Sequence, residues 1–397
     1  MAHLSERIKA LSESQTIAMA RKSRELQEQG IDIISLSLGE PDFNTPEVIK
    51  QAAKKALDDN YTYYTHVSGY LGLREAICKK FKRDNNLTYT ADEIVVSTGA
   101  KQSIANAVLC LINPGDEVIV PSPYWVSYLE ILKLAEAKAV VIPATIDDDF
   151  KITPEKLAKH ITSKTRMIMF STPCNPTGSV YSKDELKALA EVVAKHDELY
   201  ILCDEIYEHI NFIGGHESMA QFDFIRDRVI TINGVSKGFA MTGWRGGILA
   251  APKWIAQACD KMQGQFTSAT CSITQKAMHA AMEMPIETTY QMRDAFKRRR
   301  DLVLNLVKGI PGMKANVPEG AFYVFPEISY YFGKSYNGIT INNGTDLCMY
   351  LIQEAHVSMV PGAAFGDDNY IRFSYATSDE KLTEAMKRVK NALEKLK

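Results

Sequence analysis

From about residue 92 the chain alternates short apolar runs with stretches of helical spacing. The apolar runs are EIVVST, EVIVPS, AVVIPA, RMIMFST, YILCDE, RVITING and GGILAAP, between residues 93 and 252. Helix-like segments separate them, for example from Gln102 to Leu111 and from Trp125 to Leu134. Strands that alternate with helices form βαβ units. The pattern therefore predicts an α/β fold in which a large domain has a mostly parallel, seven-stranded sheet flanked by helices.

One helix of this domain carries a clear start signal. In SKDELKALAEVVAKH the residues Leu186, Leu189 and Val193 fall on one helical face. Ser182 and Glu185 have the S-x-x-E spacing of a capping box, in which each side chain bonds the other residue's backbone N–H. We expect a helix that begins directly after Ser182.

After Gly320 the pattern changes. AFYVFPEI, VSMVPGAAFG and YIRFSYAT are short strand-like or loop-like segments, with a helix near 345–355 and a closing amphipathic helix. We expect a smaller α+β domain formed by residues 1–44 and 291–397, joined to a large domain at 45–290 through a long helix near 285–308. The sequence shows no Pro-, Gly- or Ser-rich linker, internal repeat or low-complexity segment.

Composition excludes several classes of protein. A net charge of −2 provides no overall positive potential that would attract nucleic acid or an anionic membrane. The charged N-terminal residues do not resemble a signal peptide, and no window approaches the roughly 18 apolar residues of a membrane span. Seven scattered cysteines without C-x-x-C spacing favour reduced thiols, and His66 has no partner at metal-ligand spacing. We expect a cytoplasmic protein with neither a metal site nor a nucleic-acid or membrane partner.

Polar residues follow five of the predicted strands at the point where each strand ends. In open parallel sheets, ligands bind beyond the carboxyl ends of the strands, so these clusters should converge on one crevice. They are Gly99–Lys101, Pro123–Trp125, Pro173–Gly178, Asp204–Tyr207 and Ser236–Lys237.

This crevice has the parts of a phosphate site. Gly99 opens a helix after a strand and offers backbone N–H groups, while Ser236 and Arg245 add a hydroxyl and a guanidinium group. A lysine beside a bound phosphate, here Lys237, is either a counter-ion or a Schiff-base former. The second interpretation explains the other residues, because pyridoxal phosphate needs a carboxylate at its ring nitrogen, a donor at its phenolate oxygen and a ring to stack on. Asp204, Asn175 or Tyr207, and Trp125 could supply these groups.

An ordered set of motifs then identifies a family. SLSLGEPDFNTP, YTHVSGYLGLREAI, GAKQ, PSPYWVSY, NPTG, DEIYEHI, SKGFAMTGWRGG, GAFYVF, VPGAAFG and IRFSYAT occur in this order along essentially the whole chain. With them the chain resembles class I aminotransferases of the pyridoxal-phosphate fold-type I superfamily, most closely the bacterial aspartate aminotransferases of the Iβ branch. Each motif alone is weak, but the ordered set is specific.

The resemblance implies roles for residues around the cofactor. Lys237 would form the aldimine with pyridoxal 5'-phosphate and then shuttle protons as the catalytic residue. Asp204 would pair with the ring nitrogen and Trp125 would stack on the ring. Tyr207 and Asn175 would bond the 3'-oxygen. The phosphate would be held by Gly99, Ala100, Lys101, Ser236 and Arg245, and by Tyr64 from the other subunit of a homodimer.

The resemblance also implies a substrate site. Arg372 would bind the α-carboxylate as a bidentate pair, with Asn175, Trp125 and the backbone of Gly39 beside it. Lys101 and Thr16 would bind the distal carboxylate of an acidic amino acid. The implied reaction converts L-aspartate and 2-oxoglutarate into oxaloacetate and L-glutamate by a ping-pong cycle.

Other functions remain open from sequence alone. The main substrate could instead be prephenate, an aromatic amino acid or alanine, and the same cofactor could serve a β-eliminating or cyclising lyase. A non-catalytic regulatory module is disfavoured by the intact Lys237 and the slightly acidic charge. A nucleotide-binding dehydrogenase is disfavoured because no predicted strand is followed by a G-x-G-x-x-G motif.

Several of these residues also have a plainer interpretation. Tyr124 and Trp125 could be core aromatic residues, Thr16 and Asp204 could cap helices, and Arg372 could be an exposed charge.

Three positions depart from the family pattern. Cys174 stands where asparagine is usual before NPTG, Ala100 replaces a common glycine, and Gly247 lies where the family varies.

Overall fold

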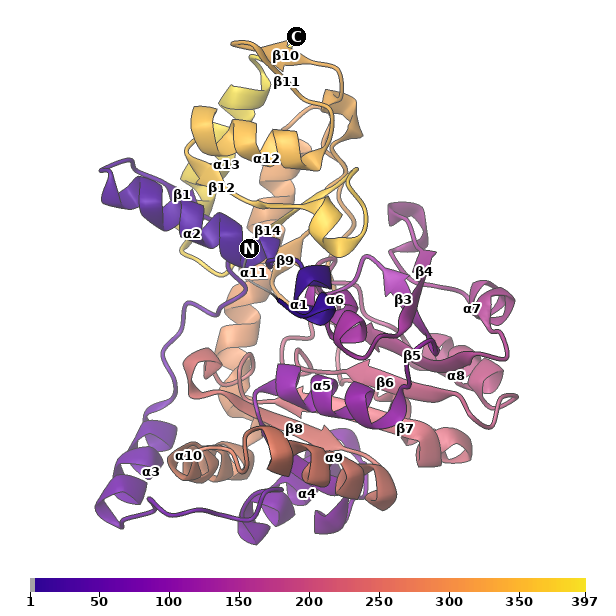
Figure 1. Ribbon diagram of the computed structural model, residues 1–397. Helices are drawn as coiled ribbons and strands as arrows, with labels where there is room; N and C mark the ends of the chain where they lie inside the picture. Colours follow the sequence, from indigo (N-terminus) through magenta and orange to yellow (C-terminus); the bar gives the residue numbers. More distant parts are fainter. Residues whose placement is uncertain (1–3) are drawn as a thin grey trace.

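The computed structural model, which describes residues 4–397, has a large lobe built on one sheet and a smaller lobe above it (Figure 1). All seven predicted runs form strands of that sheet, in the order β2-β8-β7-β6-β5-β3-β4. β8 runs antiparallel to both β2 and β7, and the other pairs are parallel. The strands are β2 (Ile94–Thr98), β3 (Glu117–Ser122), β4 (Lys138–Pro143), β5 (Thr165–Ser171), β6 (Tyr200–Asp204), β7 (Val229–Gly234) and β8 (Gly246–Ala250).

Helices cover both faces of this sheet. Side chains alternate between the faces, so that Met167 and Met169 of β5 pack into one core and Ile168 and Phe170 into the other. Residues of α5 (Ala100–Leu111), α6 (Ser127–Leu134) and α9 (Lys253–Phe266) fill the first core. Residues of α4 (Leu71–Asn85), α7 (Pro154–His160), α8 (Lys183–Val193) and α10 (Ser272–Glu283) fill the second, with α3 (Glu47–Asp58) packed on α10.

The capping box of α8 is confirmed. The Ser182 hydroxyl accepts a hydrogen bond from the Glu185 N–H at 3.3 Å, and the Glu185 carboxylate accepts one from the Ser182 N–H at 2.7 Å. The two other helices predicted for the large domain, over 102–111 and 125–134, differ slightly in where they begin. α5 starts at Ala100 rather than Gln102, directly after β2, and α6 starts at Ser127 rather than Trp125.

The smaller lobe combines short strands with long helices. Its three-stranded antiparallel sheet has the order β13-β14-β9, β1 pairs parallel with β12, and β10 and β11 form a hairpin. These strands are β1 (Ile34–Ser35), β9 (Tyr323–Val324), β10 (Ser335–Tyr336), β11 (Ile339–Thr340), β12 (Val357–Ser358), β13 (Val360–Pro361) and β14 (Ile371–Ser374). All of them except β13 pack with α2 (Gln15–Glu28), α11 (Tyr290–Lys308), α12 (Gly344–Glu354) and α13 (Asp379–Leu393) around one apolar core. Val360 of β13 belongs to a smaller cluster with Phe325 and Phe365.

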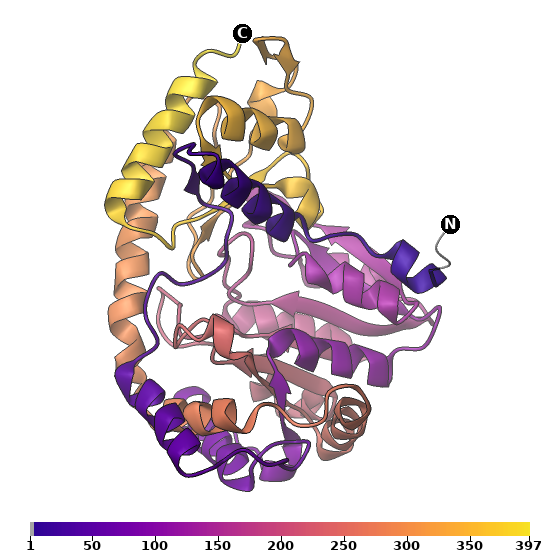
Figure 2. The same ribbon diagram turned by 60° about the vertical axis from the view of Figure 1, so that its left-hand side comes forward.

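The N-terminal segment does not lie wholly on the smaller lobe. α1 (Glu6–Ala10) lies against α6 of the large lobe (Figure 2). There the Ser12 N–H donates to the Glu130 carboxylate at 2.8 Å. Residues 1–3, with which the predicted small domain begins, lie outside the described residues.

Three other features concern the chain as a whole. All seven cysteines are unpaired. In residues 4–397 no helix is long and apolar enough to cross a membrane. The same part of the chain holds no group of three or more His, Cys, Asp or Glu residues able to bind a metal ion.

Candidate active site

The predicted crevice exists as a pocket of about 340 Å³ where the large lobe faces the smaller one. Each of the five strand-end clusters contributes to it: Ala100 and Lys101, Trp125, Asn175, Asp204 and Tyr207, and Ser236 and Lys237. Thr16, Gly39, Arg245 and Arg372 also line it, with Ser14, Ile17, Leu38, Glu40, Val126, Ser127, Ser171, Ile206, Thr242 and Tyr323. Residues more than 350 positions apart in sequence therefore meet in one place.

The amine of Lys237 is the central basic group. Its Nζ donates to the carbonyl of Gly39, which lies on the segment that enters from the smaller lobe. Desolvation in the pocket lowers the pKa of Lys237 to about 8, with the charges of Arg372 and Arg245 acting in the same direction and Glu40 against them. A large fraction of this amine is thus neutral at mildly alkaline pH and able to act as a nucleophile.

The carboxylate of Asp204 lies at the end of β6 and is 5% exposed. Burial raises its pKa to about 6, against the hydrogen bonds it accepts from the Ile206 N–H at 3.2 Å and the Tyr128 hydroxyl at 3.0 Å. Both donors are neutral groups. A protonated base bound in the pocket would therefore stabilise the buried negative charge of Asp204.

A tight turn between β2 and α5 makes an anion site. Gly99 has φ +84°, and a Cβ there would lie 2.3 Å from Nη2 of Arg245. Arg245 has φ +59° and donates through Nη1 to the carbonyl of Thr242 at 2.9 Å. Because α5 begins at Ala100, its first N–H groups and its positive dipole end face the same place as this guanidinium group.

Gly247, to which we gave no function from sequence, supports this turn. A Cβ on Gly247 would lie 2.2 Å from the carbonyl carbon of Gly99 and 2.4 Å from the nitrogen of Ala100. Only a glycine in β8 lets the turn approach so closely. The repeated glycine of TGWRGG was the available signal, and its meaning depends on the antiparallel placement of β8 beside β2.

Arg372 is buried, at 2% exposure, so the surface interpretation is wrong. It donates through Nη1 to Oδ1 of Asn175 at 3.0 Å and through Nη2 to the carbonyl of Ser37 at 2.6 Å. Its guanidinium carbon lies 4.5 Å from the ring centre of Tyr323. Burial lowers its pKa, and the neighbours that raise it are tyrosines rather than carboxylates.

Tyr323 was missed among the site residues. Its hydroxyl shares a hydrogen bond of 2.7 Å with the hydroxyl of Tyr207, and it lies where a side chain on Gly39 would be. Burial raises the pKa of Tyr207 well above its usual value, which keeps this phenol protonated. The motif GAFYVF contained the signal, but sequence alone does not distinguish its aromatic residues.

Lys101 and Thr16 both lie at the pocket. The Lys101 ammonium is 5.1 Å from the ring centre of Trp125, and burial together with Arg245 lowers the Lys101 pKa. Ser14, not Thr16, occupies the N-cap of α2, and the buried Thr16 hydroxyl has no hydrogen-bond partner in residues 4–397. Tyr124 instead belongs to the apolar core, while Trp125 lines the pocket.

Tyr64 does not lie at this pocket. It is 96% exposed in the connection between α3 and α4.

Of the remaining two departures from the family pattern, Ala100 simply begins α5. Cys174 is a free thiol whose pKa is raised by burial, with its sulfur 3.8 Å from the carbonyl of Pro123.

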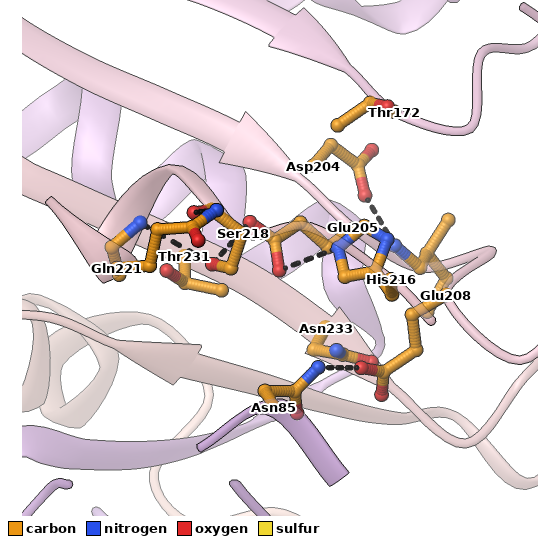
Figure 3. A network of polar contacts seen from close by, with 12 residues as sticks. Asn85, Thr172, Asp204, Glu205, Glu208, His216, Ser218, Gln221, Thr231 and Asn233 are labelled. Atoms are coloured by element: carbon orange, nitrogen blue, oxygen red, sulfur yellow. Dashed lines mark hydrogen bonds and ion pairs between the residues drawn. The ribbon is translucent and has the colours of Figure 1, made fainter. Parts of the chain in front are cut away.

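A buried polar network lies behind Asp204 (Figure 3). Glu205 accepts from the Ser218 hydroxyl at 2.7 Å and lies 2.9 Å from Nε2 of His216. Three residues further along the chain, Glu208 accepts from Asn85 at 2.9 Å (Figure 3). It also forms an ion pair with Lys80 of α4. The network joins the segment after β6, which carries Asp204 and Tyr207, to α4.

The sequence matches the model of the family "Aminotransferase class I and II" over residues 31–389. The chain belongs to this family, and the protein is an aminotransferase with the corresponding α/β fold.

The relatives that it resembles are more specific. It is 45% identical to the bifunctional aspartate aminotransferase and glutamate/aspartate-prephenate aminotransferase of Petunia hybrida, covering 99% of this chain and 83% of that protein. It is also 45% identical to the aspartate/prephenate aminotransferase of Cereibacter sphaeroides, covering 98% of each. The crystal structure of the aspartate aminotransferase from Rhizobium meliloti superposes with a TM-score of 0.96 at 40% identity, covering 100% of both chains.

Proposed function

We propose that this aminotransferase uses pyridoxal 5'-phosphate to transfer the amino group of L-aspartate to 2-oxoglutarate. The substrate assignment rests on a pair of cations in one pocket, Arg372 and Lys101. Neither of them has a carboxylate among the neighbours that raise its pKa. A buried cation without an anionic partner is costly, so Arg372 favours a ligand carboxylate. Lys101 is exposed to solvent at the same pocket and offers a second cation for a second carboxylate. Aspartate and 2-oxoglutarate both carry two.

The donor set fits the cofactor. The turn at Gly99, with Ser236, Arg245 and the start of α5, suits a phosphate monoester. Asp204 is an acid without a cationic hydrogen-bond partner, suited to a protonated ring nitrogen. Once bound, pyridoxal phosphate supplies a carbonyl that accepts the amino group and a ring that withdraws electrons from the substrate Cα.

The residues of the chain bind the substrate and transfer its protons. Arg372 binds the α-carboxylate with its free Nε edge while Asn175 and Ser37 fix its plane. Lys101 and Thr16 bind the distal carboxylate at the opposite end of the substrate. The neutral form of the Lys237 amine, which a pKa of about 8 makes accessible, would take the proton from the substrate Cα and return it at C4'.

Trp125 would lie against the cofactor ring, and Asn175 and Tyr207 would donate to the 3'-oxygen. Gly39, whose carbonyl accepts from Lys237, closes the pocket from the smaller lobe. We assign the large domain to residues 45–290 and the small domain to 1–44 and 291–397. Closure of the second on the first would exclude water from the reacting atoms.

We further propose a homodimer in which Tyr64 of one subunit reaches the phosphate of the other. Three aromatic residues support this proposal by their exposure: Tyr63 at 80%, Tyr64 at 96% and Phe266 at 66%. We place the enzyme in the cytoplasm, because seven unpaired cysteines suit a reducing compartment.

Prephenate is a second candidate substrate. It is a 2-oxo acid with two carboxylates, and the pocket adds apolar area from Ile17, Leu38 and Trp125 that a ring could contact. Relatives at 45% identity are named for prephenate. Comparing kcat/KM for oxaloacetate and prephenate, with L-glutamate as donor, separates the two.

The first experiment is the visible absorption spectrum of the purified protein with L-aspartate alone. The long-wavelength band of the bound cofactor should disappear and return on addition of 2-oxoglutarate, and Lys237→Ala should abolish both changes. A protein that binds no pyridoxal phosphate would contradict the cofactor assignment. Release of ammonia and pyruvate instead of amino transfer would indicate a β-eliminating lyase.

A further inference from the structure

Tyr128 contacts Asp204 from behind the pocket. It lies on α6, is fully buried, and donates its hydroxyl hydrogen to Oδ2 of Asp204 at 3.0 Å. The other carboxylate oxygen, Oδ1, accepts from the backbone N–H of Ile206 at 3.2 Å. Each oxygen of this buried carboxylate thus has one donor, and the only one of the two that belongs to a side chain is Tyr128.

The same ring also supports Trp125. The Tyr128 and Trp125 rings meet edge to face, with centres 5.5 Å apart and planes at 83°. Tyr128 therefore touches both residues that we place against the cofactor ring, the indole beside its face and the carboxylate at its nitrogen.

The groups that face Asp204 leave its charge dependent on this hydroxyl. Tyr128 and Cys174 both have pKa values raised by burial and stay neutral, while Glu205 is a second carboxylate next in the chain. The charge of Lys237 lowers the pKa of Asp204 only weakly, and the Lys237 amine donates its hydrogen bond to Gly39 instead. A cavity of about 10 Å³, lined in part by Tyr128, Ser171 and Cys174, lies behind the pocket and supplies no charged side chain.

We propose that Tyr128 is a positioning residue that keeps Asp204 ionised and aimed at the ring nitrogen of pyridoxal phosphate. The inference rests on the proposed function. Without the hydroxyl, one oxygen of a buried carboxylate would lose its donor, and the ionised form would become less favourable. The proton of the pair would then move from the ring nitrogen toward Asp204, so the attraction between them would weaken.

The test is the affinity of the cofactor-free protein for two probes. One is pyridoxal 5'-phosphate, and the other is its 1-deaza analogue, in which a C–H replaces the ring nitrogen. Tyr128→Phe keeps the ring that packs on Trp125 and removes only the hydroxyl. We expect this variant to bind pyridoxal phosphate about tenfold more weakly, the effect of one hydrogen bond to a charged group, with no loss of affinity for the analogue.

Tyr181→Phe is the matched control. Tyr181 is buried, its ring lines the same small cavity, and its hydroxyl accepts from the Ile152 N–H at 3.0 Å without touching Asp204. This variant should bind both probes as the parent does. In an Asp204→Asn background, Tyr128→Phe should add little further loss for pyridoxal phosphate, because no charge remains for the hydroxyl to stabilise.

Two results would overturn the inference. Equal losses for both probes would mean that Tyr128 only supports the shape of the pocket, and unchanged affinity for pyridoxal phosphate would mean that its hydroxyl does not matter to Asp204. Failure of the parent protein to bind pyridoxal phosphate would instead refute the proposed function, and this inference with it.

Discussion

The amine of Lys237 titrates in a range set by its surroundings. Desolvation lowers its pKa from 10.5 to about 8, and the negative charge of Glu40 limits the shift. Because only the neutral amine attacks a carbonyl, covalent attachment of pyridoxal phosphate to the cofactor-free protein should accelerate as pH rises and level off above about 8. The measurement is the attachment rate against pH, followed by absorbance.

Glu40→Gln tests the cause of this profile. Removing a charge that raises the pKa of Lys237 should move the midpoint to lower pH, while Glu283→Gln, an exposed control on α10, should leave it unchanged. A midpoint near 10.5 in the parent protein would show that the Lys237 amine is solvated like a surface lysine.

Under the proposed function, we expect Lys101 to determine the preference for acidic substrates. Lys101→Met keeps most of the aliphatic stem beside Trp125 and removes the charge. We expect kcat/KM for L-aspartate to fall about 100-fold, the upper range for a hydrogen bond to a charged group, and kcat/KM for L-alanine to stay within about twofold. An equal fall for both amino acids would instead place Lys101 at the cofactor.

At the scale of elements, the phosphate turn depends on how β8 lies beside β2. Gly247→Ala would place a Cβ against the backbone of Gly99 and Ala100, which cannot move away as a flexible side chain could. We expect the variant to be less stable by about 1–3 kcal/mol, the usual cost of overpacking, and to bind pyridoxal phosphate at least about tenfold more weakly because the N–H groups are displaced.

The matched control is Gly215→Ala. A Cβ at Gly215 meets no atom within 4 Å, so its stability and cofactor affinity should equal those of the parent protein. Thermal unfolding and cofactor titration measure both quantities. Normal cofactor affinity in Gly247→Ala would show that the turn does not hold the phosphate.

The network behind Asp204 contributes to stability. Burial alone would raise the pKa of the Glu208 carboxyl, but the charges of Lys80 and of nearby histidines outweigh it and hold the pKa well below its usual range. Glu208 therefore stays ionised at neutral pH, and its contribution to stability is lost only as pH falls far into the acidic range. Lys80→Met would leave this charge buried without its partner.

We expect Lys80→Met to reduce the free energy of unfolding at pH 7 by about 3–5 kcal/mol, the range for breaking a buried ion pair. Adding Glu208→Gln should restore a large part of that loss, because the unpaired charge is then gone. Denaturant unfolding of the cofactor-free protein measures both changes. No recovery in the double variant would mean that packing, rather than charge, accounts for the loss.

Much of this arrangement could be predicted from sequence because periodicity and strand-end chemistry are local signals. The seven apolar runs, the cap at Ser182 and the convergence of Lys101, Asp204 and Lys237 all follow from short stretches. The support for the site could not be predicted in this way. Tyr128, Tyr323 and Gly247 act through contacts that depend on the relative placement of distant elements.

For the whole molecule, Gly39 and Arg372 of the smaller lobe contact the large lobe across the pocket. The carbonyl of Gly39 accepts from Lys237, and Arg372 donates to Oδ1 of Asn175 at 3.0 Å. Ser37 bonds Arg372 within the smaller lobe, so these residues would move together. Movement of the smaller lobe would therefore change the contacts of Lys237 and Asn175 together, and would couple binding of the substrate carboxylate to release of the Lys237 amine.

The proposed dimer can be tested by complementation. If Tyr64 serves the pocket of the other subunit, a heterodimer of Lys237→Ala and Tyr64→Ala chains has both defects in one site and none in the other. Random reassociation of equal amounts makes half of the dimers mixed, so about a quarter of the sites should be native in such a two-fold assembly. Each variant alone, assayed at limiting pyridoxal phosphate, should be much less active than this mixture. A mixture no more active than the average of the two variants would show that Tyr64 does not act across a subunit interface.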